Sequence, residues 1–121
     1  MASAYGVVRD ATDGEGDCYE AAAHLFLSLP AEVRANARLC HGKAIGTGGD
    51  ALGLRFGHAW VEQVIFGAHL VRDSANGHDY LGPAERYYAV GQVHDVQTYT
   101  YGQMLRMLAK HQHYGPWPEQ P

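Results

Sequence analysis

Three side chains in this sequence form a set with the chemistry for covalent catalysis: Cys18, His58 and Asp73. A cysteine attacks a carbonyl carbon as its thiolate, and an imidazole within reach takes up the thiol proton. A carboxylate on the second ring nitrogen fixes the tautomer of the imidazole and stabilises its charged form. The three residue types predict nucleophilic catalysis, provided that the chain brings them together.

Cys18 stands at the predicted start of a helix. Residues 18–29 are rich in helix formers, and Asp17 with Glu20 has the spacing of a capping box. The preceding residues 9–17 carry two glycines and three aspartates, which predicts a turn-rich loop. The first turn of a helix exposes unpaired N–H groups and the positive end of the helix dipole. Both features stabilise a thiolate, so we expect Cys18 to be the nucleophile.

His58 and Asp73 lie on two predicted strands, residues 54–64 and 68–74, with a turn at Gly67. Alternation along the first strand puts His58 on an apolar face, and an antiparallel pairing with an even-length loop puts Asp73 on the same face. On its own, a histidine on an apolar face is more often a hydrogen-bonded core residue than a base. The matching aspartate and the cysteine favour the catalytic interpretation. That face of the first strand also carries Leu54, Phe56, Trp60 and Val64.

The register of the two strands has two alternatives. Direct opposition of His58 and Asp73 sets their Cβ atoms about 4.5–5.5 Å apart. The register that pairs Ile65 with Ala68 leaves them diagonal, at about 7–8 Å, but still on one face. Either register allows contact between the two side chains.

The rest of the chain supplies short elements and no internal repeat. Cys40, inside a predicted strand, is interpreted as a small buried core residue. Thr100 and Gln103 form a second capping box, which opens a last helix that we expect to run to about His113. The remaining expected elements are a short helical piece at 31–36, a strand at 37–46, a connection at 47–53, a loop at 75–83, a short helix at 83–90 and an extended segment at 96–101.

Composition limits the class of protein. The 121 residues suit a single domain spanning residues 1–121, and 46% hydrophobic with 18% charged residues is a globular balance. The net charge is −4 and the nine basic residues are scattered, which argues against nucleic acid as a partner. The sequence shows no secretory signal and no membrane span, so we expect a cytoplasmic protein with no membrane partner. In that compartment Cys18 and Cys40 are expected to be free thiols.

Three motifs resemble the transglutaminase-like branch of the papain-fold cysteine enzymes. The family pattern is G-x-C-x-x-x-A at a helix start, then H-A-W-[VT]-E on a strand, then Asp on the next strand. The chain has "GDCYEAA" at 16–22, "HAWVE" at 58–62 and "LVRDSA" at 70–75. The resemblance covers residues 16–75, about half of the chain. "HAWVE" before an Asp strand is fairly specific, whereas G-x-C-x-x-x-A alone is weak.

The resemblance implies an α+β fold in which the nucleophile helix packs on a small antiparallel sheet. It implies a Cys18–His58–Asp73 triad and acyl transfer on amides. We expect a protein or peptide substrate and no cofactor. Tyr19 replaces the tryptophan that often follows the nucleophile, and the substrate-binding additions of larger members are missing. The Cys18 backbone N–H is a candidate oxyanion donor. The side chains of Asp17, Tyr19 and Trp60 are weaker candidates for substrate or oxyanion contacts.

Other polar residues fit structural roles better. Glu62 is expected to be a solvated or salt-bridged edge residue rather than a catalytic acid. A metal site built from Cys18, Cys40, His41 or the pair His111 and His113 lacks tight zinc-ligand spacing, so no metal is expected. Four tyrosines fit either the border of a cleft or the core: Tyr87, Tyr88, Tyr99 and Tyr101.

Two further functional classes stay open. The first is a non-enzymatic interaction module with the same fold and an inert triad. The second is another papain-fold activity, such as a cell-wall endopeptidase or an N-acyltransferase, against which "HAWVE" argues mildly. Hydrolysis is the default over amine transfer, because so small a core has little surface with which to exclude water. Small stand-alone chains of this kind also occur in bacteriophage and actinobacterial genomes, which the resemblance suggests as a source.

Overall fold

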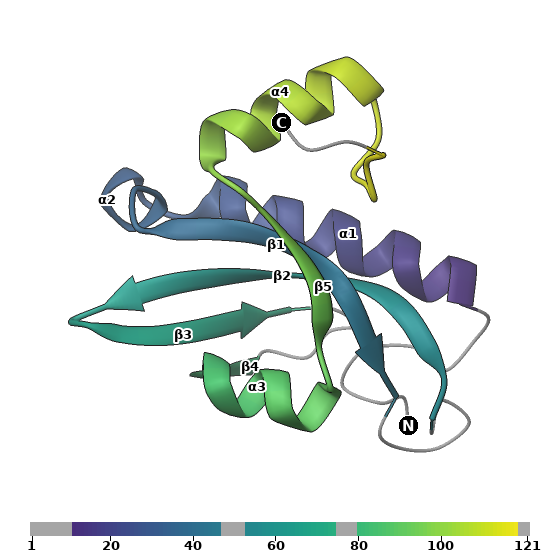
Figure 1. Ribbon diagram of the computed structural model, residues 1–121. Coiled ribbons are helices and arrows are strands. Elements are labelled where there is room, and N and C mark those ends of the chain that lie inside the picture. The colour runs from purple at the N-terminus through teal and green to yellow at the C-terminus, as the bar shows by residue number, and fades with distance from the viewer. Residues whose placement is uncertain (1–10, 47–52, 75–79, 119–121) are drawn as a thin grey trace.

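A five-stranded antiparallel sheet forms the centre of the protein in the computed structural model, which describes residues 11–46, 53–74 and 80–118 (Figure 1). The strand order is β4-β3-β2-β1-β5, and every neighbouring pair is antiparallel. The strands are β1 (Ala37–Ile45), β2 (Arg55–Ile65), β3 (Ala68–Asp73), β4 (Tyr80–Pro83) and β5 (His94–Tyr99). The helices are α1 (Ala11–Ser28), α2 (Ala31–Arg34), α3 (Ala84–Gly91) and α4 (Tyr101–His111). The protein is therefore a mixed α and β structure around an antiparallel sheet.

The sheet separates two apolar cores. One core joins α1, α4 and the C-terminal tail to the side of β2 that carries Ala59 and Val61. The other joins α3 to the opposite side of β2, which carries Phe56 and Trp60. Side chains on a strand alternate between faces, so His58 shares the α3 face with Phe56 and Trp60. Both faces of β2 are buried, which explains why its middle residues are all shielded from solvent.

Helix α1 begins earlier than the sequence predicts. It starts at Ala11, so residues 11–17 are helical rather than a turn-rich loop. The two glycines in this stretch lower helix propensity, but each residue added to an existing helix gains a backbone hydrogen bond. As a result, Cys18 is the eighth residue of the helix and does not lie in its first turn.

The β2–β3 hairpin adopts the second of the two registers considered from the sequence, with Ile65 opposite Ala68. Its two-residue turn is formed by Phe66 and Gly67, at φ values of 49° and 81°. Positive φ at both central residues is typical of a type I′ turn, whose twist matches that of the flanking strands. His58 and Asp73 are consequently diagonal rather than directly opposed. Phe66 is fully exposed at the tip of the hairpin.

The other elements follow the sequence with one exception. The strand at 37–46, the helices at 31–36 and 83–90 and the extended segment at 96–101 are present within a few residues. The Thr100–Gln103 capping box is confirmed by reciprocal bonds of 3.1 Å and 2.8 Å. The expected loop at 75–83 is wrong over Tyr80–Pro83, which pairs with β3 as an edge strand. Most of the expected connection at 47–53, and residues 75–79, lie outside the described residues.

None of the helices in the described ranges has both the length and the apolar character that crossing a bilayer requires.

Candidate active site

His58 is enclosed by aromatic rings on the α3 face of the sheet. Its side chain is fully buried. The rings of Trp60 and Tyr87 lie nearly parallel to the imidazole, with centroids 5.9 Å and 6.5 Å away. Phe56 meets it edge-on at 5.7 Å. Trp60 therefore packs beside the histidine ring and shields it from solvent.

Asp73 holds one nitrogen of this imidazole. His58 Nε2 lies 2.8 Å from Asp73 Oδ2, and both side chains are buried. The same oxygen accepts a hydrogen bond of 2.6 Å from the Tyr87 hydroxyl on α3. The diagonal register thus still brings the two strand residues into contact. Nδ1 is the ring nitrogen that Asp73 does not engage.

The charge balance of the pair favours a protonated imidazole. Burial is the largest influence on His58 and acts to lower its pKa. The charge and hydrogen bond of Asp73, followed by the hydrogen bond and charge of Cys18, outweigh burial and raise the pKa of His58 to about 9. An imidazolium beside a carboxylate is the form expected at neutral pH.

Cys18 reaches this site from the other side of the sheet. It belongs to the core formed with α1, and its Sγ lies 3.9 Å from the carbonyl oxygen of Gly57, the residue before His58. Figure 1 shows β2 curving strongly in its first half, beside the N-terminal half of α1. The hydrogen bond and charge of Cys18 act on the pKa of His58, so the thiol and the imidazole interact. The three predicted residues therefore form one cluster.

Two features of Cys18 differ from the sequence-based expectation. Its position in the middle of α1 removes the argument that the helix dipole stabilises its thiolate, because that effect fades beyond the first turn. In an α-helix each N–H bonds to the carbonyl four residues earlier, so the Cys18 N–H is directed at Gly14. That N–H is not available as an oxyanion donor. Cys18 is also only 2% exposed, so a substrate reaches it only after neighbouring groups move.

The three weaker candidates for substrate or oxyanion contacts, Asp17, Tyr19 and Trp60, do not lie together. The side chain of Asp17 lies outside the described residues. Tyr19 is buried against His41 rather than His58, with ring centroids 4.7 Å apart. Trp60 contacts His58 through its ring face, and its N–H donates to Glu62. The Trp60 N–H is therefore bonded to Glu62 and is not directed at a substrate site.

Glu62 is more deeply involved than the sequence suggests. It is buried, so the expectation of a solvated edge residue is wrong, although its bond to His69 fits the salt-bridge alternative. One carboxylate oxygen accepts from the Trp60 N–H at 2.8 Å and from the Tyr88 hydroxyl, and the other lies 2.7 Å from His69 Nε2. Burial, followed by the hydrogen bond and charge of Glu62, raises the pKa of Tyr88. The signal in the sequence was the motif itself, since Glu62 lies on the same strand face as His58 and Trp60.

Cys40 and the four tyrosines singled out from the sequence have structural roles. Cys40 is completely buried, and burial followed by the charge of Glu62 raises its pKa well above the usual range. Both cysteines are free thiols. Tyr87 and Tyr88 take part in the two carboxylate networks, whereas Tyr99 and Tyr101 pack with the α1-side core.

His41 forms a separate buried site near the C-terminal tail. It is 5% exposed, and neither ring nitrogen has a hydrogen-bond partner within the described part of the chain. The rings of Tyr19, Tyr99 and Trp117 lie 4.7 Å, 5.1 Å and 4.8 Å from it. Burial lowers the pKa of His41 to about 3, so it is neutral in the folded protein. Across the described ranges no three metal-ligating side chains cluster together.

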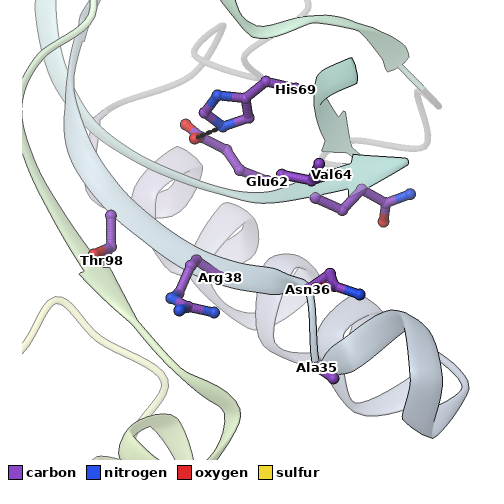
Figure 2. A pocket seen from close by; sticks show the side chains of 8 residues that line it. Ala35, Asn36, Arg38, Glu62, Val64, His69 and Thr98 are labelled. Carbon is purple, nitrogen blue, oxygen red and sulfur yellow. Dashed lines mark hydrogen bonds and ion pairs between the residues drawn. The ribbon is translucent and has the colours of Figure 1, made fainter. Parts of the chain in front are cut away.

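Two cavities lie near the two ends of β2, the strand that carries His58. A cavity of about 300 Å³ is lined by Lys43, Arg55, Phe56, Gly57, His94 and Asp95, and so borders the backbone that Cys18 contacts. A larger one of about 400 Å³ lies at the other end of β2, with Glu62 and His69 on its wall (Figure 2). The smaller cavity is the better candidate for substrate entry, because Gly57 lies next to both Cys18 and His58.

Comparison of the chain with protein-family models, with curated proteins and with solved structures gives no match. The resemblance to transglutaminase-like enzymes therefore rests on the three sequence motifs alone.

Proposed function

We propose that this protein is a thiol-dependent amide acyl-transfer enzyme with a transglutaminase-like core, in which Cys18 is the nucleophile, His58 the base and then the acid, and Asp73 the residue that orients His58. The observation that carries the proposal is the buried His58–Asp73 bond of 2.8 Å, with the Cys18 thiol interacting with the same imidazole. The helix that bears the cysteine packs on β2, the strand that bears the histidine, and the aspartate lies on the neighbouring strand β3, an arrangement that supports the resemblance.

In the proposed reaction the reactive state is an ion pair, in which the proton of the Cys18 thiol resides on His58 and a thiolate lies beside the imidazolium. The thiolate attacks the carbonyl carbon of an amide, and the imidazolium returns the proton to the leaving nitrogen as the C–N bond breaks. This step releases an amine and leaves a thioester on Cys18. Neutral His58 then takes a proton from water, which attacks the thioester and releases the carboxylic acid and the free thiol. The carboxylate of Asp73 stabilises the imidazolium in both halves.

The proposed acceptor is water and the proposed substrate is a protein or peptide amide. An activated ester tests the chemistry without knowledge of that substrate, because p-nitrophenyl acetate acylates any competent thiol. We expect a burst of p-nitrophenol and an acetyl group on Cys18 by mass spectrometry. Cys18→Ala and His58→Ala should each abolish the burst, and Asp73→Asn should slow it, by about 10⁴-fold if it behaves as a serine triad does. Cys40→Ala is the control and should retain the burst.

Transfer to an amine is tested in the same assay. Added putrescine should leave the rate of acyl-enzyme breakdown unchanged if water is the acceptor. Formation of acetylputrescine would instead identify an amine acceptor. An acetyl group found on Cys40, or a burst that persists in Cys18→Ala, would contradict the proposal.

A non-enzymatic interaction module is the second candidate. Two observations favour it: the low exposure of Cys18, and the loss of its N–H to the helix. Under this alternative the triad is a buried polar network that stabilises the fold. A folded Cys18→Ala protein that retains its full biological effect in cells would support the module and exclude catalysis.

A further inference from the structure

Trp60 has no proton to exchange in the proposed reaction, yet it is the largest side chain in contact with His58. It is completely buried and packs against His58, Tyr87 and Tyr88. A tryptophan has two rotatable side-chain bonds, and its ring can pack in more than one orientation. Packing against the neighbouring rings limits these orientations. A hydrogen bond from the indole N–H selects one of them.

Glu62 makes that hydrogen bond. Its Oε2 accepts from the indole N–H at 2.8 Å and from the Tyr88 hydroxyl of α3. Its Oε1 lies 2.7 Å from His69 Nε2 on β3, as Figure 2 shows by the dashed line. A carboxylate with donors from two other elements has little freedom to rotate. The acceptor for the Trp60 N–H is therefore fixed in place.

The position of Trp60 affects the orientation of the His58 ring, because the two rings pack against each other. The indole plane lies 26° from the imidazole plane, with centroids 5.9 Å apart. Asp73 bonds to one nitrogen of the His58 ring, and the Trp60 ring packs against the face of the same imidazole. On the opposite edge of Trp60, a Cβ at Gly42 would lie 2.9 Å from Cη2, so the indole already fills the space available to it. The indole packs against one face of the imidazole, and the hydrogen bond to Glu62 holds the indole in that position.

We infer that Glu62 is a positioning residue for the triad: through its hydrogen bond to the Trp60 N–H it sets the orientation of the His58 ring toward Cys18. The inference deepens the proposed function and rests on it for any effect on rate. The orientation of the ring itself is measurable whether or not the protein is an enzyme.

The decisive comparison is between Glu62→Met and Glu62→Gln. Methionine has a similar length but cannot accept a strong hydrogen bond, so the indole N–H loses its partner. Glutamine keeps a carbonyl oxygen for that N–H and removes only the charge. Glu85→Met makes the same chemical change on the exposed face of α3 and is the matched control.

Two readouts separate positioning from mere stability. The first is the NMR signals of the His58 ring protons, which sense ring currents from Trp60 and Tyr87. The second is the turnover of p-nitrophenyl acetate, divided into kcat and KM. We expect Glu62→Met to shift the His58 signals and lower kcat by about 10- to 100-fold with little change in KM. Glu62→Gln should be close to wild type in both, and Glu85→Met should be unchanged.

The inference is overturned if folded Glu62→Met keeps the wild-type His58 signals, or if Glu62→Gln is as damaging as Glu62→Met. Should Glu62→Met fail to fold, Gly42→Ala moves Trp60 from its other edge without touching Glu62. A shift of the Trp60 indole signal without a shift of His58 in that variant would also overturn it. If the wild-type protein shows no acyl transfer but Glu62→Met still shifts the His58 signals, the positioning role stands and only the proposed function is rejected.

Discussion

Tyr87 and Asp73, 14 residues apart, are joined by a hydrogen bond of 2.6 Å on the same carboxylate oxygen that binds His58. The tyrosine comes from α3 and the aspartate from the end of β3, so the bond fixes the helix to the strand. A second donor on Oδ2 also limits rotation of the carboxyl group about its own axis. The triad is consequently held by four elements rather than by the three that carry it.

Replacing Tyr87 with phenylalanine should weaken the fold. Tyr87→Phe keeps the ring beside His58 but removes a donor to a buried carboxylate, which costs about 1–3 kcal/mol. Urea unfolding monitored by circular dichroism measures the change in free energy. Tyr101→Phe is the control, because the Tyr101 hydroxyl accepts only a partly buried bond from Arg34. An equal loss in both variants would contradict a special role for Tyr87.

Alkaline pH should destabilise the protein through His58. Its pKa is raised to about 9 in the folded state, from 6.5 for the isolated side chain. Stabilisation from a raised pKa is complete below the unfolded value and is lost as pH rises through the folded one. The free energy of unfolding should therefore fall between about pH 6.5 and about pH 9. Asp73→Asn removes the main cause of the raised pKa, so its stability should be lower at neutral pH and should change less over this range. Urea titrations at several pH values test this, and parallel curves for both proteins would count against it.

Acidic pH should destabilise the protein through His41. Burial lowers its pKa from 6.5 to about 3, so the unfolded chain binds a proton over a range in which the folded protein does not. Stability from a lowered pKa is present above the unfolded value and is lost as pH falls toward the folded one. His41→Phe keeps an aromatic ring and has no proton to bind. Thermal unfolding from neutral pH down to about pH 4 should show a smaller drop in Tm for this variant than for wild type. An unchanged drop would mean that carboxyl groups alone cause the acid sensitivity.

Alkylation should distinguish the two cysteines. Cys18 lies beside His58, which carries positive charge at neutral pH, whereas burial raises the pKa of Cys40. We expect iodoacetamide to modify Cys18 first at neutral pH and Cys40 only on unfolding, as read by mass spectrometry of peptides. His58→Gln should slow modification of Cys18 and leave Cys40 unaffected. Equal rates at both sites would show that reaction follows unfolding and that Cys18 is not activated.

Local patterns in the sequence predict most of this fold. The capping box at Thr100 and the shared face of Phe56, His58 and Trp60 each depend on residues close in sequence, and both are present. The sequence places the start of α1 too late, because the glycines at 14 and 16 lower helix propensity but do not prevent a helix from extending by one hydrogen bond per residue. Strand β4 was missed because four residues containing Gly82 and Pro83 have no strand pattern. An edge position, where one side of the strand needs no partner, tolerates such residues.

The candidate site was predictable only in its outline. Residue types and strand parity identify His58 and Asp73, but they carry no information on which helix covers that face. The contacts of Tyr87 with Asp73 and of Tyr88 with Glu62 join residues 14 and 26 positions apart on different elements. The burial of His41 beneath Trp117 joins β1 to the tail. Such contacts depend on how distant elements pack together, and no periodic pattern in the local sequence predicts them.

The turn between β2 and β3 has a consequence for how the protein behaves at high concentration. Phe66 adopts a left-handed backbone conformation that asparagine and glycine favour, and its ring is fully exposed next to the half-exposed Val64. An exposed apolar hairpin tip that contributes nothing to either core promotes association between molecules. An asparagine at position 66 would relieve the backbone and remove the ring together, which makes this turn the first place to improve the solubility of the protein without touching its interior.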